Sequence, residues 1–217
     1  MKCFSYSFKV VRLFSVLFVL TLLVACSAKK QAPERKLHQT EYGWTMTLPP
    51  GFDSVPPKDW ERLQNRGREA VEQTFDTTIE NRARMLYIFQ SGQYNYFEAI
   101  VQPADYTKGK LYRESFKGVN DLLFEALETQ MPGVRLDSTY DEEIVGGLRF
   151  LRFDINVHLP QMKLQMIMFS QLFGNEEVSV NITCADPKKL ATLLEAWRSS
   201  TFSKETTDLP SALRELM

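Results

Sequence analysis

The sequence predicts an α+β fold, an antiparallel sheet of about six to seven strands with helices packed on its faces. Strand-like runs gather between residues 134 and 184, separated by Gly-Gly, Pro-Gln and Gly-Asn turn signals. Three other segments carry apolar residues at helical spacing. Strands grouped apart from helices are typical of an antiparallel sheet covered by helices.

The first predicted elements are a strand and a helix. The predicted domain begins near Glu41, with a short strand over 43–48 that stops at Pro49-Pro50-Gly51. A helix over 57–75 follows, because its apolar residues recur at intervals of three and four. This part of the chain therefore starts as strand, turn and helix.

A hairpin and a second helix come next. Two strand-like runs, 84–90 and 94–102, are joined across Ser91-Gly92-Gln93. A helix over about 110–130 carries an apolar stripe and ends at Pro132-Gly133. We expect both elements to contribute one face to the core.

The segment 134–184 predicts four strands of an antiparallel meander. Alternate residues of its second strand share a face. One face is apolar (Leu151, Phe153, Ile155, Val157, Leu159), and the other holds Phe150, Arg152, Asp154, Asn156 and His158. The methionines of the third strand (Met162, Met166, Met168) are predicted to fill the core. A last helix begins after Asp186 as N-cap, with Pro187 in its first position.

The first 25 residues have the pattern of a secretory signal peptide. Lys2, Lys9 and Arg12 make a basic start, and thirteen uncharged residues follow from Leu13 to Ala25. A membrane-spanning helix needs about 20 apolar residues, so this run is short for a span.

The end of that run, Leu23-Val24-Ala25-Cys26, resembles the lipobox of bacterial lipoproteins. In that family the Cys receives a diacylglycerol on its sulfur, the signal is cut before it, and the new amino terminus is usually acylated, for example with palmitate. The resemblance implies a firm anchor at Cys26, since two or three acyl chains hold a protein where one does so marginally. Basic residues (Lys29 and Lys30) stand where surface-exported lipoproteins carry acidic ones, which favours the periplasm-facing side of the outer membrane. An ordinary secretory signal with an incidental Cys26 is the alternative.

These features divide the chain into four parts. We expect a signal peptide over 1–25, a polar, flexible, lipid-anchored tether over 26–40, a single domain over 41–203 and a C-terminal tail over 204–217 with the pattern of a short helix. Removing the signal leaves 23 basic and 27 acidic residues, evenly mixed. No basic stripe points to nucleic acid.

The domain resembles a known fold family. Its start (YGWTMTLPPGF), its long meander and its end (VSVNITCADPKKLATLLEAWRSSTF) resemble the PsbP-like α/β/α sandwich over about residues 41–203. That family includes an extrinsic subunit of photosystem II, a nuclear-import factor that binds a small GTPase, and many small bacterial lipoproteins of unassigned role. The resemblance implies a docking module rather than an enzyme, and no partner-binding motif matches.

One strand face carries the candidate catalytic cluster of Arg152, Asp154 and His158. His158 and Asp154 stand roughly 13 Å apart along a strand, too far for a hydrogen bond, whereas Arg152 and Asp154 at roughly 7 Å can pair. A solvated polar face is the alternative interpretation. The other histidine, His38, lies in the predicted tether, so a His-rich metal site is not expected.

Tyrosines around the first hairpin form a candidate binding surface. Tyr87, Tyr94 and Tyr96 could contact a glycan or a protein partner if they were exposed. Cross-strand aromatic pairing explains them equally well.

Two further features carry no expected chemistry. The acidic residues Asp137, Asp141, Glu142 and Glu143 lack the spacing of a calcium loop and are expected to be a solvated edge. Cys184 shares a face with apolar residues, so we expect a buried structural thiol rather than a nucleophile.

The sequence therefore predicts a non-enzymatic binding or scaffold module, anchored by lipid in a bacterial envelope and docking a protein partner, with no cofactor and no metal. The alternative is a carrier for a small apolar ligand such as a lipid, suggested by the Met- and Phe-rich meander. An enzyme built on Arg152, Asp154 and His158 is the third hypothesis.

Overall fold

The computed structural model describes residues 34–76, 78, 80–104 and 112–203. The chain divides into two compact units, Met1–Pro33 and Glu34–Met217, and every described residue belongs to the second. The predicted signal peptide, Cys26, the first part of the tether and the tail over 204–217 lie outside the described residues. Within the described part of the chain, no helix is both long and apolar enough to cross a bilayer.

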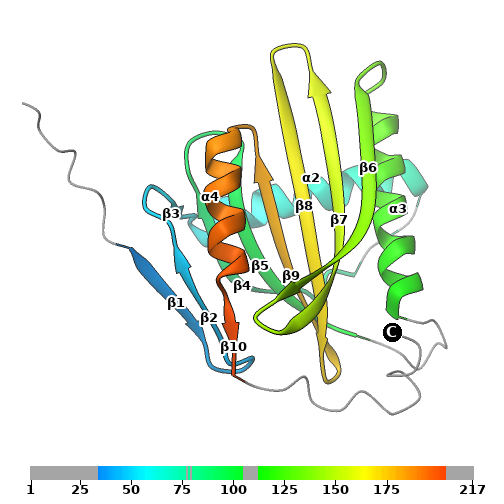
Figure 1. The fold of residues 1–217 in the computed structure, drawn as a ribbon. Coiled ribbons are helices and arrows are strands. Elements are labelled where there is room, and N and C mark those ends of the chain that lie inside the picture. The colour runs from blue at the N-terminus through cyan, green and yellow to red at the C-terminus, as the bar shows by residue number, and fades with distance from the viewer. Residues whose placement is uncertain (1–33, 77, 79, 105–111, 204–217) are drawn as a thin grey trace, which may run out of the picture. The chain divides into compact units, whose positions relative to one another are not determined.

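A seven-stranded antiparallel sheet confirms the predicted fold class (Figure 1). Its strand order is β3-β4-β5-β9-β8-β7-β6, so the first hairpin joins the meander through pairing of β5 with β9. The strands are β3 (Asp53–Ser54), β4 (Arg84–Gln90), β5 (Asn95–Pro103), β6 (Arg135–Val145), β7 (Leu148–Leu159), β8 (Met162–Phe173) and β9 (Glu176–Cys184).

A second sheet of three strands uses residues that the sequence did not place in the domain. It consists of β1 (Arg35–Gln39), β2 (Trp44–Leu48) and β10 (Thr201–Phe202), in the order β1-β2-β10. The prediction of a flexible tether up to residue 40 is therefore wrong for β1, which pairs with β2 along its whole length. Leu37 is the one buried side chain of β1, so the strand carries little apolar signal.

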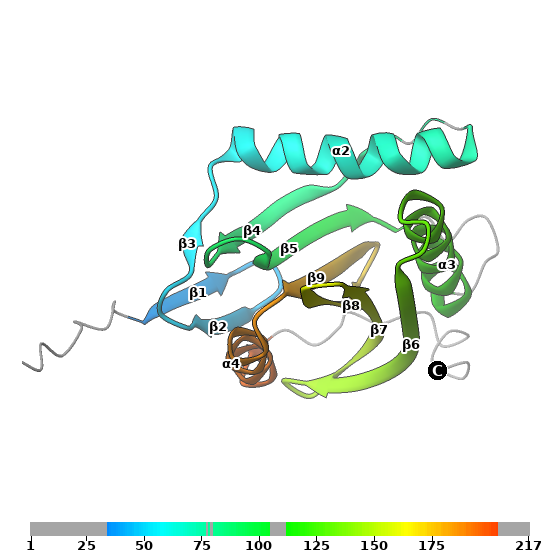
Figure 2. The ribbon, with the colours of Figure 1, turned by 90° about the horizontal axis from the view of Figure 1, so that it is seen from above.

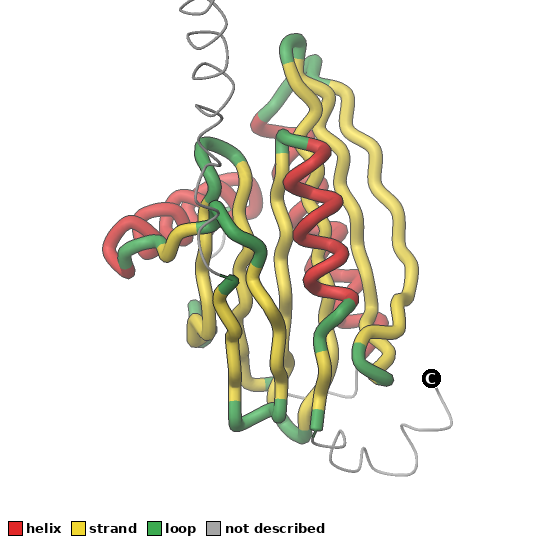
Figure 3. Tube along the Cα trace, turned by 60° about the vertical axis from the view of Figure 1, so that its left-hand side comes forward, coloured by secondary structure: helices red, strands yellow, loops and turns green. Residues whose placement is uncertain are grey.

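The described helices lie on both sides of the large sheet (Figures 2 and 3). Helix α4 (Pro187–Arg198) and the three-stranded sheet cover one side, which we call the α4 side. Helices α2 (Pro57–Phe75) and α3 (Tyr112–Gln130) lie on the other, the α3 side. Helix α4 begins as predicted, because the Asp186 side chain accepts hydrogen bonds from the backbone N–H groups of Lys188 and Lys189.

The α4 side holds a densely packed aromatic core. Trp197 of α4 is fully buried and meets Trp44 edge-on at 5.8 Å between ring centroids. Phe150 packs edge-on against the same Trp197 ring at 5.0 Å. Edge-to-face aromatic pairs of this kind add to the free energy gained by burial. The three buried residues of α4 thus join both sheets into one core.

The α3 side is less completely covered. Phe153, Ile155 and Val157 of β7 are buried there, with the predicted methionines Met166 and Met168 packed around them. The buried residues of the 19-residue α3 are Asn120 and Ala126, and the first of these is polar. Helix α3 is therefore held to the sheet by partly exposed contacts.

Candidate functional site

The predicted polar face forms an ion-pair network. As the strand spacing predicts, Arg152 pairs with Asp154 through two bonds, Nε to Oδ1 at 2.7 Å and Nη2 to Oδ2 at 2.6 Å. Its remaining Nη1 donates to Oε2 of Glu143 at 2.7 Å. Glu143 also accepts from Nε of Arg198 at 2.6 Å, which ties the end of α4 to β6. Charge-assisted bonds with this geometry position and stabilise structural elements.

The same network sets the ionisation of its carboxyl groups. Burial raises the pKa of Glu143, but the hydrogen bonds and charges of Arg198 and Arg152 outweigh it and leave the pKa below its usual value. A general acid or base near neutral pH needs the opposite shift. Glu143 is therefore an ion-pair partner.

His158 bonds to a different carboxylate. Its Nε2 lies 2.6 Å from Oδ2 of Asp137 on the neighbouring strand. That hydrogen bond, together with Arg135, lowers the pKa of Asp137. The structure thus places the three predicted residues on one strand face but divides them between two separate ion-pair groups. Among the described residues, no group of His, Cys, Asp or Glu side chains is arranged to hold a metal ion.

The three predicted surface tyrosines do not form a common surface. Tyr87 faces the α4 side, edge-on to Trp44 at 5.7 Å and stacked on Phe89. Tyr96 faces the α3 side, where its hydroxyl accepts a hydrogen bond from Gln90. Tyr94 lies in the hairpin turn with a left-handed φ of 62°. Strand alternation separates side chains that are close in sequence, so this predicted site must be corrected.

Cys184 is buried on the α4 side, among the residues of the aromatic core. Burial raises the pKa of its thiol to about 11, with a smaller contribution from Asp186. A thiol that stays protonated at neutral pH is a poor nucleophile. This environment agrees with the structural interpretation of Cys184.

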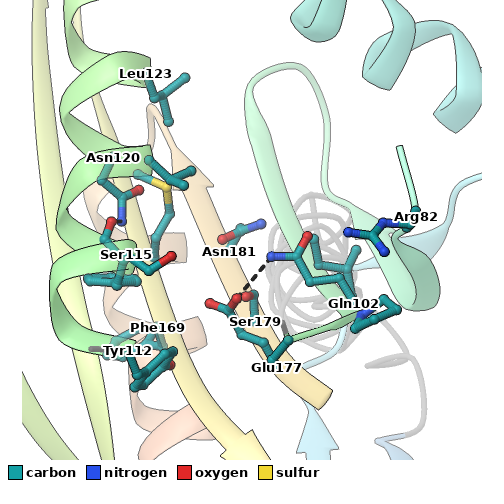
Figure 4. Close-up of a pocket in the computed structure, with 16 residues that line it drawn as sticks. Arg82, Gln102, Tyr112, Ser115, Asn120, Leu123, Phe169, Glu177, Ser179 and Asn181 are labelled. Atoms are coloured by element: carbon teal, nitrogen blue, oxygen red, sulfur yellow. Dashed lines mark hydrogen bonds between the residues drawn. The ribbon is translucent and has the colours of Figure 1, made fainter. Parts of the chain in front are cut away.

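A groove on the α3 side is the main cavity of interest (Figure 4). It has a volume of about 520 Å³ and lies between α3 and strands β5, β8 and β9. It is lined by Arg82, Ile100, Gln102, Pro103, Ala104, Tyr112, Ser115, Phe116, Val119, Asn120, Leu123, Met168, Phe169, Glu177, Ser179 and Asn181.

The floor of the groove is polar because of strand alternation. The apolar residues of β9 face the α4 core, so the intervening Glu177, Ser179 and Asn181 face α3. On β5, Gln102 lies directly opposite Glu177 in the sheet register, and Ile100 lies opposite Ser179. The floor therefore alternates carboxylate, hydroxyl and amide groups along one strand.

Hydrogen bonds fix one end of the floor. Gln102 Nε2 donates to Glu177 Oε2 at 2.9 Å, and the Ser170 hydroxyl donates to the other oxygen of Glu177. The hydroxyl of Tyr112, at the start of α3, lies 2.5 Å from Ser170 Oγ. This series of hydrogen bonds attaches the first turn of α3 to the sheet.

The wall of the groove is amphipathic. Helix α3 contributes apolar Phe116, Val119 and Leu123 together with polar Ser115 and Asn120. Val119 is 64 % exposed and marks the rim. Figure 4 shows the amides of Asn120, Asn181 and Gln102 around the same space. Side-chain amides both donate and accept, so the groove can bind a ligand with mixed polar groups.

A carboxyl group with a raised pKa stands beside the groove. Glu98 of β5 lies opposite Asn181 in the register, and Asn181 Nδ2 donates to its Oε2 at 3.4 Å. Burial raises the pKa of Glu98 to about 7, and the Asn181 bond offsets this only in part. Raised pKa values next to a cavity often mark functional sites.

Sequence reasoning missed this groove. Its lining comes from β5, β8, β9, α3 and the segment before β4, so no short motif contains it. The alternation of Glu177, Ser179 and Asn181 with valines and an isoleucine was the available signal. It predicts a polar face on β9, but it does not say which helix covers that face.

Comparison with known proteins shows the fold. No known family and no curated protein matches the sequence. The solution structure of cyanobacterial PsbP (CyanoP) from Synechocystis sp. PCC 6803 matches with a TM-score of 0.50 at 9 % identity, covering 82 % of this chain and 97 % of that one. The described domain therefore has the PsbP-like fold, and at this identity the match concerns the fold alone.

Two further solved structures give lower scores. The Ran-binding protein Mog1p from Saccharomyces cerevisiae matches with a TM-score of 0.39 at 10 % identity, covering 78 % of this chain and 95 % of its own. LpqN, involved in cell envelope biogenesis of Mycobacterium tuberculosis, matches with a TM-score of 0.35 at 10 % identity, covering 79 % of this chain and 91 % of its own.

Proposed function

We propose that this chain is a lipid-anchored protein of the bacterial cell envelope that acts as a non-enzymatic binding module, and that it docks a protein partner at the α3 groove. The observation that carries the proposal is a cavity of about 520 Å³ on the sheet face that α3 covers loosely. Pockets that bind small molecules commonly have volumes of about 300–1,000 Å³, so a groove of this size can hold a side chain or a short segment of a partner.

The state of the ionisable groups supports binding over catalysis. Arg152, Asp154 and Glu143 satisfy one another, and His158 is paired with Asp137. The Cys184 thiol is buried and its pKa is raised. Catalysis needs a nucleophile or proton carrier directed at a substrate, whereas these charged groups are paired with each other and the thiol is enclosed in the core.

The proposed location rests on the sequence before the domain. Leu23-Val24-Ala25-Cys26 has the lipobox pattern after a basic and apolar start. We propose that acylation of Cys26 holds the domain at the periplasm-facing side of the outer membrane. Replacing Cys26 with Ala should release the protein from membranes, and an unmodified wild-type Cys26 in mass spectrometry would contradict the anchor.

A carrier for an apolar molecule fits this groove less well. Its wall has apolar Phe116, Leu123 and Met168, but its floor carries Glu177 and Asn181. An apolar ligand would cover these floor groups without hydrogen-bonding them, which costs free energy. A protein surface offers both kinds of contact.

Site-specific photo-crosslinking in cells tests the docking site. A photoreactive residue replaces Val119 at the groove rim, and the matched control replaces Ile144, which is equally exposed at 67 % but does not line the groove. We expect a discrete product from position 119 alone, and the protein identified in it should bind the purified chain. Equal products from both positions, or none from position 119, would exclude the groove as the docking site.

A further inference from the structure

Glu177 lies in the groove floor, and Glu98 stands beside the other end of that floor, next to the lining residue Asn181. Both belong to the α3-side face of the sheet, since Glu98 pairs in register with Asn181 and Gln102 pairs with Glu177. Gln102 is four positions along β5 from Glu98, which corresponds to roughly 13 Å along a strand. A ligand lying along the floor can therefore have one carboxylate near each end.

Glu98 has no cationic partner among the described residues. On β4, Ile88 lies opposite it, and on β9 its neighbour is the neutral amide of Asn181. Helix α2 lies on the same side of the sheet (Figure 2), and its charged Arg68 and Glu72 pair with each other at 3.8 Å. None of the ion pairs in the described part of the chain includes Glu98, although its side chain is partly buried.

A partly buried carboxylate without a cation gains free energy from either a proton or a bound positive charge. The groove supplies the means of reaching it, because Asn181 both lines the cavity and bonds to Glu98. The Asn181 carbonyl, the Ser179 hydroxyl and the Glu98 carboxylate together offer acceptors for the three N–H groups of an ammonium ion.

The rest of the groove suits an aliphatic amine. Phe116, Leu123 and Met168 form an apolar wall against which a methylene chain can pack while its charged end reaches the floor. The cationic lining residue, Arg82, lies beyond Gln102 in Figure 4 and pairs with Glu80 at 3.7 Å. Its charge is therefore offset by a carboxylate of its own.

We propose that the α3 groove binds a primary ammonium group on an aliphatic chain, held between Glu98 and Asn181. The inference rests on the proposed binding function and specifies its ligand chemistry. A lysine side chain of a partner protein and a free aliphatic diamine share this chemistry, and the experiment below separates them.

The site has a distinctive pH dependence. An aliphatic ammonium group has a pKa of about 10, so it stays charged between pH 6 and pH 8. Glu98 in the free protein loses its proton across that interval, since burial places its pKa at about 7. The ligand binds the ionised carboxylate, so affinity rises with pH, by about tenfold from pH 6 to pH 8.

Calorimetric titration of the full-length chain with 1,5-diaminopentane tests the inference. The uncharged control ligand is 1,5-pentanediol, and the control variant is Glu125→Gln, which removes a carboxylate from the exposed side of α3. We expect the diamine to bind more tightly at pH 8 than at pH 6 and the diol not to bind. Glu98→Gln should lower the affinity for the diamine at least about tenfold at pH 8 and remove the pH dependence of binding. Glu125→Gln should change neither the affinity nor its pH dependence.

A second measurement does not depend on a variant. Carbon-13 NMR of the Glu98 carboxyl should show its pKa falling when the diamine is bound, because a nearby cation favours the carboxylate. Equal binding of diamine and diol, unchanged affinity in Glu98→Gln, or a Glu98 pKa that does not change when the diamine is added would overturn the inference.

Two peptide ligands separate the sources of the amine. N-acetyl-lysine methylamide represents a partner's lysine, and its side-chain-acetylated form is the neutral control. Binding of the lysine compound assigns the site to a protein partner, whereas binding of the diamine alone assigns it to a free amine. Should crosslinking at Val119 identify a partner while neither amine binds, the ligand chemistry is wrong and the docking function stands.

Discussion

The two faces of the seven-stranded sheet differ in how completely they are covered. On the α4 side, Leu190, Leu193 and Trp197 are buried against two sheets, and the surrounding core residues are buried as well. On the α3 side, a longer helix buries Asn120 and Ala126 and leaves a groove beside it. Burial of apolar area is the main favourable term in folding. The α4 side therefore contributes more to stability, and the α3 side is the face that we propose binds a partner.

The charged groups follow the same division. On the α4 side, Arg198, Glu143, Arg152 and Asp154 form a closed network. On the α3 side, Glu98 lacks a cation and its pKa is raised. Charged groups that are paired with each other stabilise the fold, whereas a carboxylate without a cation is available to a ligand.

A Leu→Ala substitution in α4 and in α3 should give the largest difference in stability between the two sides. Leu193→Ala empties a fully buried site on α4 and should lower the free energy of unfolding by about 3–5 kcal/mol. Leu123→Ala removes a partly exposed side chain at the groove and should cost about 1 kcal/mol. Urea denaturation measures both, and equal losses would contradict the comparison.

The β6–β7 turn offers a second contrast at adjacent glycines. Gly146 has a φ of +56°, and a Cβ there would lie 2.7 Å from Phe202 and 2.8 Å from the Ser200 carbonyl. Gly147 has a φ of +83° with open space around it. Gly146→Ala should therefore cost about 3 kcal/mol, because the φ strain of about 1 kcal/mol adds to a clash with β10. Gly147→Ala should lower the free energy of unfolding by the φ strain alone. Thermal melting of both variants checks the difference.

Breaking the arginine network should lower stability by less than the core substitutions, and the loss should depend on pH. Arg152→Gln leaves Glu143 and Asp154 with fewer partners and should cost about 2 kcal/mol at pH 7. Arg149→Gln breaks an exposed pair with Glu142 and should cost under about 1 kcal/mol.

The sign of the pH effect follows from Glu143, whose folded-state pKa is lowered. Stability from such a group is present above its unfolded pKa of about 4.3 and is lost as the pH falls through the folded value. The gap between wild type and Arg152→Gln should therefore be widest near pH 7 and shrink below about pH 4. Urea titrations at several pH values measure it, and a gap independent of pH would contradict this role of the network.

The smallest expected effect is at Cys184. Its thiol is buried and its pKa is raised to about 11, so the folded chain should not react with iodoacetamide at pH 7.5. Mass spectrometry of the Cys184 peptide should show labelling only after denaturation. Rapid labelling of the folded chain would mean that the α4 side opens.

Much of the fold was predictable because its elements carry local signals. The meander has strict alternation and glycine turns, and α4 has Asp186 and Pro187 at its start. Strand β1 was missed because its five residues bury a single side chain, Leu37, and gain their hydrogen bonds from β2. Its pairing is a tertiary feature that composition does not reveal.

The candidate site was much less predictable. Spacing along one strand correctly paired Arg152 with Asp154, because that distance is fixed by strand geometry. It could not pair His158 with Asp137, which comes from the neighbouring strand. The groove depends on where α3 lies against β5 and β9, and the raised pKa of Glu98 depends on its burial in the folded domain.

Hydrogen exchange of the chain in cell envelopes, compared with the purified chain, tests most directly whether the α3 side is the binding face. The account predicts that peptides from α3 (Tyr112–Gln130) exchange more slowly in envelopes, since the partner covers a helix that the sheet holds loosely. Peptides from α4 (Pro187–Arg198) should exchange equally in both samples. Unchanged exchange in α3, or new protection confined to the α4 side, would contradict the account.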